Sequence, residues 1–501
     1  MDLQAVLKAF YRHVAPEDLL ERDASDLYGA VMAELRLATE RPQGKAAVRV
    51  FTPSVSVNGW TAGGHTVVEV VTDDMPFLVD SVSMSLAEDQ HDIHLVIHPQ
   101  FVVRRDLGGQ LLEVLDESAQ TDEHDVARES WMHLEIDRVS DDQLEEIQEQ
   151  LTKVLVDVRD AVEDWARMHT QVDVIVRDLE EHPPPLPGDE LEQGKSLLRW
   201  LADNHFTFLG YREYALEAAG DHETLIAVPG TGFGILRADP PAPRVLPEAV
   251  ASRARDKHLL VLAKANSRAT VHRPVFLDYV GVKKFDADGE VVGERRFLGL
   301  FSSAAYTESV RRIPVLREKA TEVIDIVGLD PNSHAGKALM DVLETYPRDE
   351  LFQTPVEDLV PIAAQVMYTR ERRQLRLFVR RDLYGRFLSC LVYLPRDRYN
   401  TTVRERIAAI LKEQLHGDHI EYTAHVGESF AARLHFVVRP APGERIGAPD
   451  LADLERRFLG LFSSAAYTES VRRIPVLREK ATEVIDIVGL DPNSPAGKAL
   501  M

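Results

Sequence analysis

A glycine-rich string at residues 230–234 is the part of this sequence most similar to a nucleotide-binding loop. It reads Gly-Thr-Gly-Phe-Gly. A dinucleotide-binding loop follows a parallel strand, and a helix opens on its third glycine. Here residues 235–237 run into Asp239, Pro240 and Pro241, which do not start a helix. We therefore predict a glycine turn between two strands. No Walker loop, zincin motif or serine nucleophile elbow occurs.

His91, His94 and His98 form the closest group of possible metal ligands in the sequence. On a strand, His94 and His98 share a face while His91 points to the opposite one. These three ligands converge only if a loop intervenes, so we favour solvated histidines. The sequence predicts no metal site in this chain.

A short basic run lies between residues 370 and 381. Its members are Arg370, Arg372, Arg373, Arg376, Arg380 and Arg381. The guanidinium groups of such a run can bind the carboxylate of an effector. The alternative that we favour is a solvated strand face whose arginines pair with acidic groups elsewhere.

Composition excludes several classes of protein. With 501 residues and 45% hydrophobic residues, the chain can form about three domains, each with its own core. A formal charge of −24 argues against nucleic acid as a partner. The single cysteine, Cys390, excludes a disulfide scaffold and fits the cytoplasm, and its apolar neighbours predict a buried small hydrophobe. Neither a signal peptide nor a membrane span is expected.

The elements of the first half suggest a ferredoxin-like domain over residues 60–180. Residues 1–50 form an N-terminal helical segment, on the apolar spacing of residues 1–40. Strands are predicted at 66–71, at 93–103 and at 131–137, where Met132, Leu134 and Ile136 face one way and acidic and imidazole side chains the other. Pro76 suits the first turn of a helix over 77–86.

A second helix of this domain is predicted at residues 141–162. Ser140 and Gln143 fit a capping box before an apolar stripe at helical spacing. We expect residues 172–176 to be the closing strand of the split βαβ arrangement.

The remaining elements predict an α+β chain in which a second ferredoxin-like domain flanks a strand-rich middle. The proline-rich stretch at 182–188 reads as a linker. Strands are expected to predominate from residue 197 to 285, in a domain over 190–300. A helical segment at 301–362, interrupted at 328–332, leads to the second ferredoxin-like domain at 365–455.

The final segment repeats an earlier one. Residues 456–501 copy 295–340, and the identity begins one residue earlier in each copy, with His334 replaced by Pro495 as the only difference. Solenoid repeats diverge and stack head to tail, so a recent duplication or an assembly error fits better than two docking elements. If the helix that begins near Asp450 continues into Phe458–Leu461, we expect a foreign apolar face that packs poorly or projects away.

Four longer strings carry a resemblance to a known family. They are Thr72–Ser81 (TDDMPFLVDS), Ile97–Pro99 (IHP), Asn204–Tyr211 (NHFTFLGY) and Gly299–Tyr306 (GLFSSAAY). With these strings the chain, from about residue 1 to 440, resembles the N-terminal region of large bacterial NAD-specific glutamate dehydrogenases of the actinobacterial type.

The resemblance implies a cytoplasmic homo-oligomeric enzyme, much longer than this chain, that converts L-glutamate, NAD and water to 2-oxoglutarate, ammonia and NADH. It also implies ACT-like domains, which agree with the two ferredoxin-like blocks, and a PAS-like middle. The family's lysine-bearing substrate pocket and Rossmann domain are not found here, so we expect neither catalytic nor NAD-binding residues in this chain. The alternatives are a free-standing amino-acid-sensing ACT protein and an inactive truncated fragment.

ACT-like domains commonly bind amino acids at a strand-to-helix turn, where helix amides receive a carboxylate. Asp74, Met75, Pro76 and Phe77 occupy that turn, and they are our candidate effector site. The alternative is an aspartate that only caps the helix.

Overall fold

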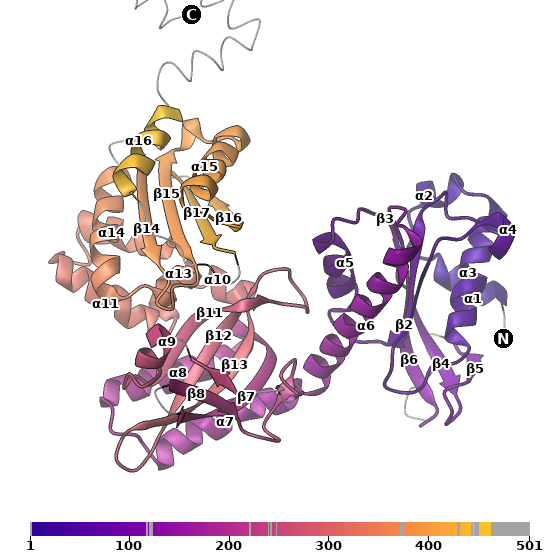
Figure 1. Cartoon of the computed structure of the whole chain (residues 1–501), viewed down its shortest axis with the longest axis horizontal. Coiled ribbons are helices and arrows are strands. Elements are labelled where there is room, and N and C mark those ends of the chain that lie inside the picture. Colours follow the sequence, from indigo (N-terminus) through magenta and orange to yellow (C-terminus); the bar gives the residue numbers. More distant parts are fainter. Residues whose placement is uncertain are drawn as a thin grey trace, which may run out of the picture. The chain divides into compact units, whose positions relative to one another are not determined.

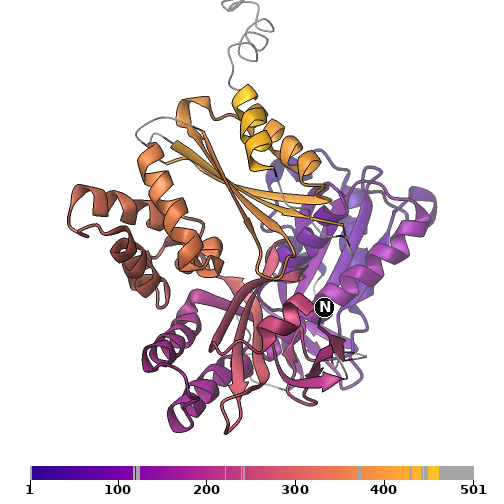
Figure 2. The same ribbon diagram turned by 60° about the vertical axis from the view of Figure 1, so that its left-hand side comes forward.

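The computed structural model describes residues 3–461 except 117–118, 120–123, 220–221, 239, 241–242, 247, 371–374, 428–430, 442–443 and 445–449. The chain forms two compact units, Met1–Thr307 and Glu308–Met501. Figures 1 and 2 show the elements of each unit. Among the described residues, no helix has the length and apolar character needed to cross a membrane.

The first unit begins with helices and a six-stranded antiparallel sheet of order β1-β2-β6-β4-β5, in which β3 also pairs with β6. The strands are β1 Ala47–Phe51, β2 Thr66–Asp73, β3 Ile93–Ile97, β4 Gln100–Arg105, β5 Leu111–Val114 and β6 Val126–Ile136. The helices are α1 Leu3–Phe10, α2 Pro16–Leu20, α3 Ala24–Ala38, α4 Val55–Asn58, α5 Leu78–Glu88 and α6 Asp141–Glu163.

Helices cover both faces of this sheet (Figure 1). On one face, Met132, Leu134 and Ile136 pack with α5 and α6. On the other face, Trp131 packs with α1 and α3. The predicted alternation along 131–137 is therefore confirmed. On the second face His133 and Glu135 are buried, whereas the side chain of Asp137 is half-exposed.

One prediction for this region is wrong. Residues 172–176 are not a strand, because they lie in helix α7, Trp165–Glu181. Met168, Val172, Ile175, Val176 and Leu179 are its buried residues, and their helical spacing outweighs the β-branched composition. The edge next to β2 is taken instead by β1, from the N-terminal side.

The predicted strand at 93–103 is interrupted. His98 and Pro99 separate β3 from β4, although both strands pair with β6. The proline has no N–H to contribute to the ladder, which accounts for the break. Helix α6 has the predicted capping box at Ser140 and Gln143.

A second antiparallel sheet completes the first unit, with order β10-β8-β7-β13-β12-β11 and β9 paired with β7. Its strands are β7 Phe206–Ala219, β8 His222–Ala227, β9 Phe233–Gly234, β10 Arg244–Val245, β11 Leu260–Arg268, β12 Phe276–Phe285 and β13 Val291–Phe301. The helices around it are α7, α8 Gly188–Trp200, the turn η1 Leu201–His205, α9 Glu248–Ala254 and α10 Ser303–Thr307.

The strand-rich region therefore begins later than predicted, at Phe206, because residues 197–205 are helical. Its sheet shares a core with the first one: Leu209, Val271 and Leu300 belong to the same buried cluster as Leu151 of α6. The two sheets of this unit are thus packed against each other through α5 and α6.

The second unit combines a helical segment with a four-stranded antiparallel sheet. The helices are η2 Val310–Arg312, α11 Leu316–Val327, α12 His334–Glu344, α13 Arg348–Gln353 and α14 Val356–Arg370. The predicted interruption is present, since Gly328 ends α11 in the left-handed conformation. The sheet has order β14-β15-β17-β16, formed by β14 Arg376–Arg381, β15 Leu388–Pro395, β16 His419–His425 and β17 Ala431–Arg439.

Helices α15 Thr401–Gln414 and α16 Leu451–Leu461 cover one face of this sheet. The expectation that Phe458–Leu461 packs poorly is wrong for Phe458, which is fully buried, and for Leu461, which packs against the same cluster. Both fall on the face that Leu454 also uses, so the copied residues continue the amphipathic pattern of the helix. The rest of the copy lies outside the described residues.

Candidate functional site

The predicted effector turn connects β2 to α5. The backbone N–H of Asp74 donates to the carbonyl of Arg128, 3.0 Å away, which holds the turn against β6. Asp74 and Pro76 are exposed, whereas Met75 and Phe77 are half-buried against the shared core. Phe77 begins the helix with φ 73°, a left-handed conformation that is uncommon for a bulky side chain. No side chain caps α5 at its N-cap, so the alternative of a capping aspartate is not supported.

Phe77 contacts the loop between β11 and β12. Its ring lies 4.9 Å from that of His272, measured between centroids. Behind it, the backbone N–H of His272 donates to Ser81 Oγ over 3.0 Å, and His272 Nδ1 lies 3.7 Å from Asp80. Partial burial, together with the charge of Arg273, lowers the pKa of His272. The turn is therefore part of the contact between the two sheets of the first unit.

Charged neighbours distinguish Asp73, the last residue of β2, from Asp74, which follows it. Asp73 is paired with Arg41 at 2.7 Å and with Arg159 at 2.6 Å. Asp74 makes no ion pair with any described residue, and it lies close enough to His98 that its charge opposes the lowering of the His98 pKa by burial. Asp74 thus remains exposed beside the helix N-terminus, an arrangement that can receive the ammonium of an amino acid while the helix amides receive its carboxylate.

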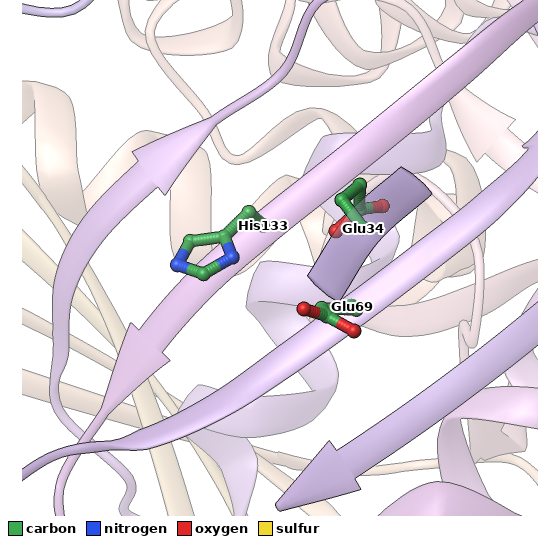
Figure 3. Close-up of side chains that lie close together, drawn as sticks. All are labelled: Glu34, Glu69 and His133. Atoms are coloured by element: carbon green, nitrogen blue, oxygen red, sulfur yellow. The ribbon is translucent and has the colours of Figure 1, made fainter. Parts of the chain in front are cut away.

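A second polar cluster lies inside the first sheet. Glu34 of α3, Glu69 of β2 and His133 of β6 each offer one ligand atom within 4.8 Å of the others. Figure 3 shows that the two carboxylates and the imidazole lie close together. All three side chains are fully buried. This is a donor set suitable for a divalent cation.

Arginines compensate part of the negative charge at this cluster. Arg49 donates to Glu69 Oε2, with its Nε 2.8 Å away. The next residue along β6 on the same face, Glu135, is held by both guanidinium nitrogens of Arg22. Although burial raises the pKa of Glu135, His133 and Arg22 outweigh it and lower this pKa to about 2. Burial raises the pKa of Glu34 and of Glu69.

Three models of glutamate dehydrogenase segments match the chain: the ACT1 domain at residues 6–151, helical motif 1 at 313–372 and the ACT2 domain at 376–464. The NAD-specific glutamate dehydrogenase of Pseudomonas aeruginosa is 38% identical over 455 residues. That of Halomonas elongata is 37% identical over 462 residues, and that of Mycobacterium tuberculosis 33% over 454.

This chain belongs to the N-terminal region of the large NAD-specific glutamate dehydrogenases. The three alignments cover 90%, 90% and 88% of the chain, and 28%, 28% and 26% of the respective relatives. The chain therefore spans little more than a quarter of the length of these glutamate dehydrogenases. Both the effector turn and the buried cluster lie within the ACT1 match.

The other motifs of this glutamate dehydrogenase region have structural roles. Gly230 has φ 74° in a turn before β9, as predicted for 230–234. Arg212 donates to the carbonyl of Ala238, 2.9 Å away, and so fixes the chain beyond that turn. Cys390 is fully buried in the second core, which confirms its prediction as a small hydrophobe.

The histidines at 91, 94 and 98 do not form a metal-ligand group among the described residues. His94 Nε2 lies 2.7 Å from Asp137, and its ring stacks on His65. His98 instead bonds to Ser130 Oγ.

Within the described part of the basic run at 370–381, Arg381 is exposed and Arg376 is half-buried, so only Arg380 departs from the predicted solvated face. Arg380 is buried and makes two hydrogen bonds to the carboxylate of Glu350 on α13, at 2.9 and 2.8 Å. Arg372, Arg373 and the side chain of Arg370 lie outside the described residues.

Sequence reasoning missed the cluster of Glu34, Glu69 and His133. A signal was present, because Glu69 interrupts the otherwise apolar run 67–71 of a central strand, where a charged residue needs a partner. The sequence did not indicate that α3 brings Glu34 to the same place.

Proposed function

We propose that this chain is the regulatory and self-associating region of an NAD-dependent glutamate dehydrogenase. In the whole enzyme, L-glutamate, NAD and water become 2-oxoglutarate, ammonia and NADH in the cytoplasm. The proposal rests on the matches to two ACT domains and a helical motif of these enzymes. The region itself contributes no catalytic residue and no NAD site, and the second sheet serves as a PAS-like domain. Its partners are further copies of itself and an amino acid, with no role for nucleic acid or membranes.

The amino-acid effector binds, in this proposal, at Asp74, Met75, Pro76 and Phe77. The observation that carries it is the exposed carboxylate of Asp74 beside a helix N-terminus that no side chain caps. The contact of Phe77 with His272 gives binding a route to the second sheet, because a shift of the turn must displace the loop between β11 and β12. Regulation then follows from a difference in effector affinity between two arrangements of these sheets.

Titration calorimetry of the purified chain with L-glutamate, L-aspartate and L-arginine tests the effector site. We expect heat from at least one of them and its loss in Asp74→Ala. Asp89→Ala is the matched control, since Asp89 is an exposed aspartate at the other end of α5. The effector proposal is wrong if no amino acid gives heat, or if both variants bind as the unmodified chain does.

Dehydrogenase assays test the assignment to the enzyme. NADH production is expected from the whole enzyme with L-glutamate and none from this chain alone. Turnover by the isolated chain would overturn the statement that it lacks catalytic residues.

A further inference from the structure

Five buried polar atoms without hydrogen-bond partners belong to three neighbouring side chains between the first sheet and α3. They are both carboxylate oxygens of Glu34, Oε1 of Glu69 and both ring nitrogens of His133. Each unsatisfied buried polar group costs about 1–3 kcal/mol, and more when it is charged. Native interiors satisfy nearly all such groups, so a concentration of this kind indicates a bound species.

The charges around these atoms leave an unbalanced carboxylate. Arg49 pairs with Glu69 Oε2, which leaves Oε1 directed into the cluster. Arg22 pairs with Glu135, the nearest further carboxylate. Glu34 has no ion pair with any described residue, and Arg49 acts on it only through the electrostatic attraction of its charge. With these carboxylates ionised, two arginines face three negative charges, and a cation restores the balance.

The positions of the ligands suit a metal ion. Glu34, Glu69 and His133 come from three separate elements, and their ligand atoms lie within 4.8 Å of one another (Figure 3). Two carboxylates and one imidazole form a set used for Zn²⁺ and for Mn²⁺ or Fe²⁺, with the remaining positions filled by water.

Charged groups lie next to His133 and Glu69, although no described residue hydrogen-bonds to the His133 ring. A histidine that binds a metal usually directs its other nitrogen to a carboxylate, and a carboxylate ligand is itself hydrogen-bonded. Glu135 Oε1 lies 3.6 Å from His133 Nε2, and Arg49 holds the second oxygen of Glu69. A cavity of about 10 Å³, close to the space that one water needs, borders His133 and Glu135 but neither Glu34 nor Glu69.

We propose that Glu34, Glu69 and His133 bind one divalent transition-metal cation, of which Zn²⁺ is the best fit, and that this ion fastens α3 to β2 and β6. The site is independent of the amino-acid turn and of catalysis, so the experiment that tests it does not depend on the proposed function. The sequence had predicted no metal, because the three ligands are widely separated along the chain.

The competing occupant is a proton on Glu34. A neutral carboxylic acid relieves the charge imbalance without any metal, as buried carboxyl groups often do. The effect of Glu34→Gln on metal binding distinguishes between a bound metal and a bound proton. This variant keeps the shape and neutralises the side chain, so it preserves the fold under either account, but it removes a metal ligand.

The test uses the full chain, treated with chelator, dialysed, and mixed with Zn²⁺ before gel filtration and elemental analysis. We expect one tightly bound Zn²⁺ per chain and a rise in melting temperature on zinc addition. Glu34→Gln is expected to lose this zinc, with an affinity loss beyond the about 10–100-fold that follows removal of an outer hydrogen-bond partner. Co²⁺ supplies a second readout, since visible absorption bands report its coordination by the protein.

His94→Gln is the matched control against adventitious binding. His94 is an exposed histidine that stacks on His65 and pairs with Asp137, so it represents the surface sites where zinc also collects. We expect this variant to retain the tight zinc and the thermal shift. The proposal is overturned if the chain binds no zinc tightly, if Glu34→Gln binds it as before, or if His94→Gln alone loses it.

Discussion

The ring of Phe77 lies 4.9 Å from that of His272, so the first turn of α5 touches the loop between β11 and β12. A second contact supports the first, because Ser81 Oγ accepts from the backbone N–H of His272. Phe77, the residue before helix α5 in the ACT1 match, is thus packed on the loop that joins two strands of the neighbouring sheet. Any ligand that moves this turn acts on both sheets.

A double-mutant cycle measures this contact. Phe77→Leu and His272→Ala each remove one ring, and we expect their effects on the unfolding free energy to be coupled by about 0.5–1.5 kcal/mol, the usual range for packed rings. Thermal unfolding of the two single variants and the double variant gives the coupling. Additivity within about 0.3 kcal/mol would show that the rings do not interact energetically.

Glu129 is expected to be the most sensitive carboxylate of the first sheet. Arg105 binds it with two hydrogen bonds, Arg41 lies 2.6 Å away, and Trp131 donates to it over 3.0 Å. Glu129→Gln leaves Arg105 without its carboxylate and Arg41 with Asp73 alone, so we expect a loss of about 3–5 kcal/mol in stability. Glu113→Gln, an exposed carboxylate on β5, should have almost no effect.

The contribution of Glu129 to the stability of the chain changes with pH in a definite direction. Burial alone would raise its pKa, but the hydrogen bonds and charges of Arg105 and Arg41 lower it below 4.5. The stabilisation is therefore complete above the unfolded-state pKa and is lost as the pH falls through the folded-state value. Scanning calorimetry from pH 7 down to pH 3 should show a smaller acid loss for Glu129→Gln than for the unmodified chain. Equal losses would contradict the prediction.

Lys319 joins α11 to the end of α13 in the second unit. Its Nζ donates to the carbonyls of Leu351, Phe352 and Thr354, at 2.9, 3.0 and 2.9 Å. Lys319→Met leaves these acceptors without a donor, and we expect a loss of about 1–3 kcal/mol for the acceptors that remain unsatisfied. Lys337→Met on α12 is the exposed control. Denaturant unfolding of the two variants makes the comparison.

The titration of Lys319 predicts a change in the stability of the chain at alkaline pH. Burial lowers its pKa to about 8, from 10.5. Between these values the unfolded chain binds more protons than the folded one, so this group's contribution to stability rises with pH. The unmodified chain should gain stability relative to Lys319→Met between about pH 8 and pH 10. A constant difference over that interval would contradict the lowered pKa.

Cys390 should be unreactive in the folded chain. It is fully buried on β15, and burial raises the pKa of its thiol, which suppresses the reactive thiolate. We expect no reaction with a disulfide reagent under native conditions and one equivalent in denaturant. Rapid native labelling would show that β15 opens.

Local sequence patterns were sufficient to predict those elements in which capping residues, apolar spacing and secondary-structure propensity all indicate the same structure. The capping box of Ser140 and Gln143 with the stripe behind it fixed the start of α6, and the alternation along 131–137 identified both faces of β6. The strings at 72–81 and 204–211 were sufficient to identify the family by resemblance. The β-branched run 172–176 misled because strand propensity and helical spacing disagreed there, and packing followed the spacing.

One repeated string separates what sequence decides from what tertiary structure decides. Glu-Arg-Arg-Phe-Leu-Gly-Leu occurs at 294–300 within strand β13 and again at 455–461 within helix α16. Identical local propensities therefore gave opposite structures, because β13 is paired on both sides by β7 and β12, whereas residues 451–454 begin a helix that the copy continues onto the second core. The cluster of Glu34, Glu69 and His133 likewise forms through tertiary packing and not through local sequence. Sequence determined that each element forms and which face it buries, and only the packing of α3 on β2 and β6 brought three distant polar side chains to one point.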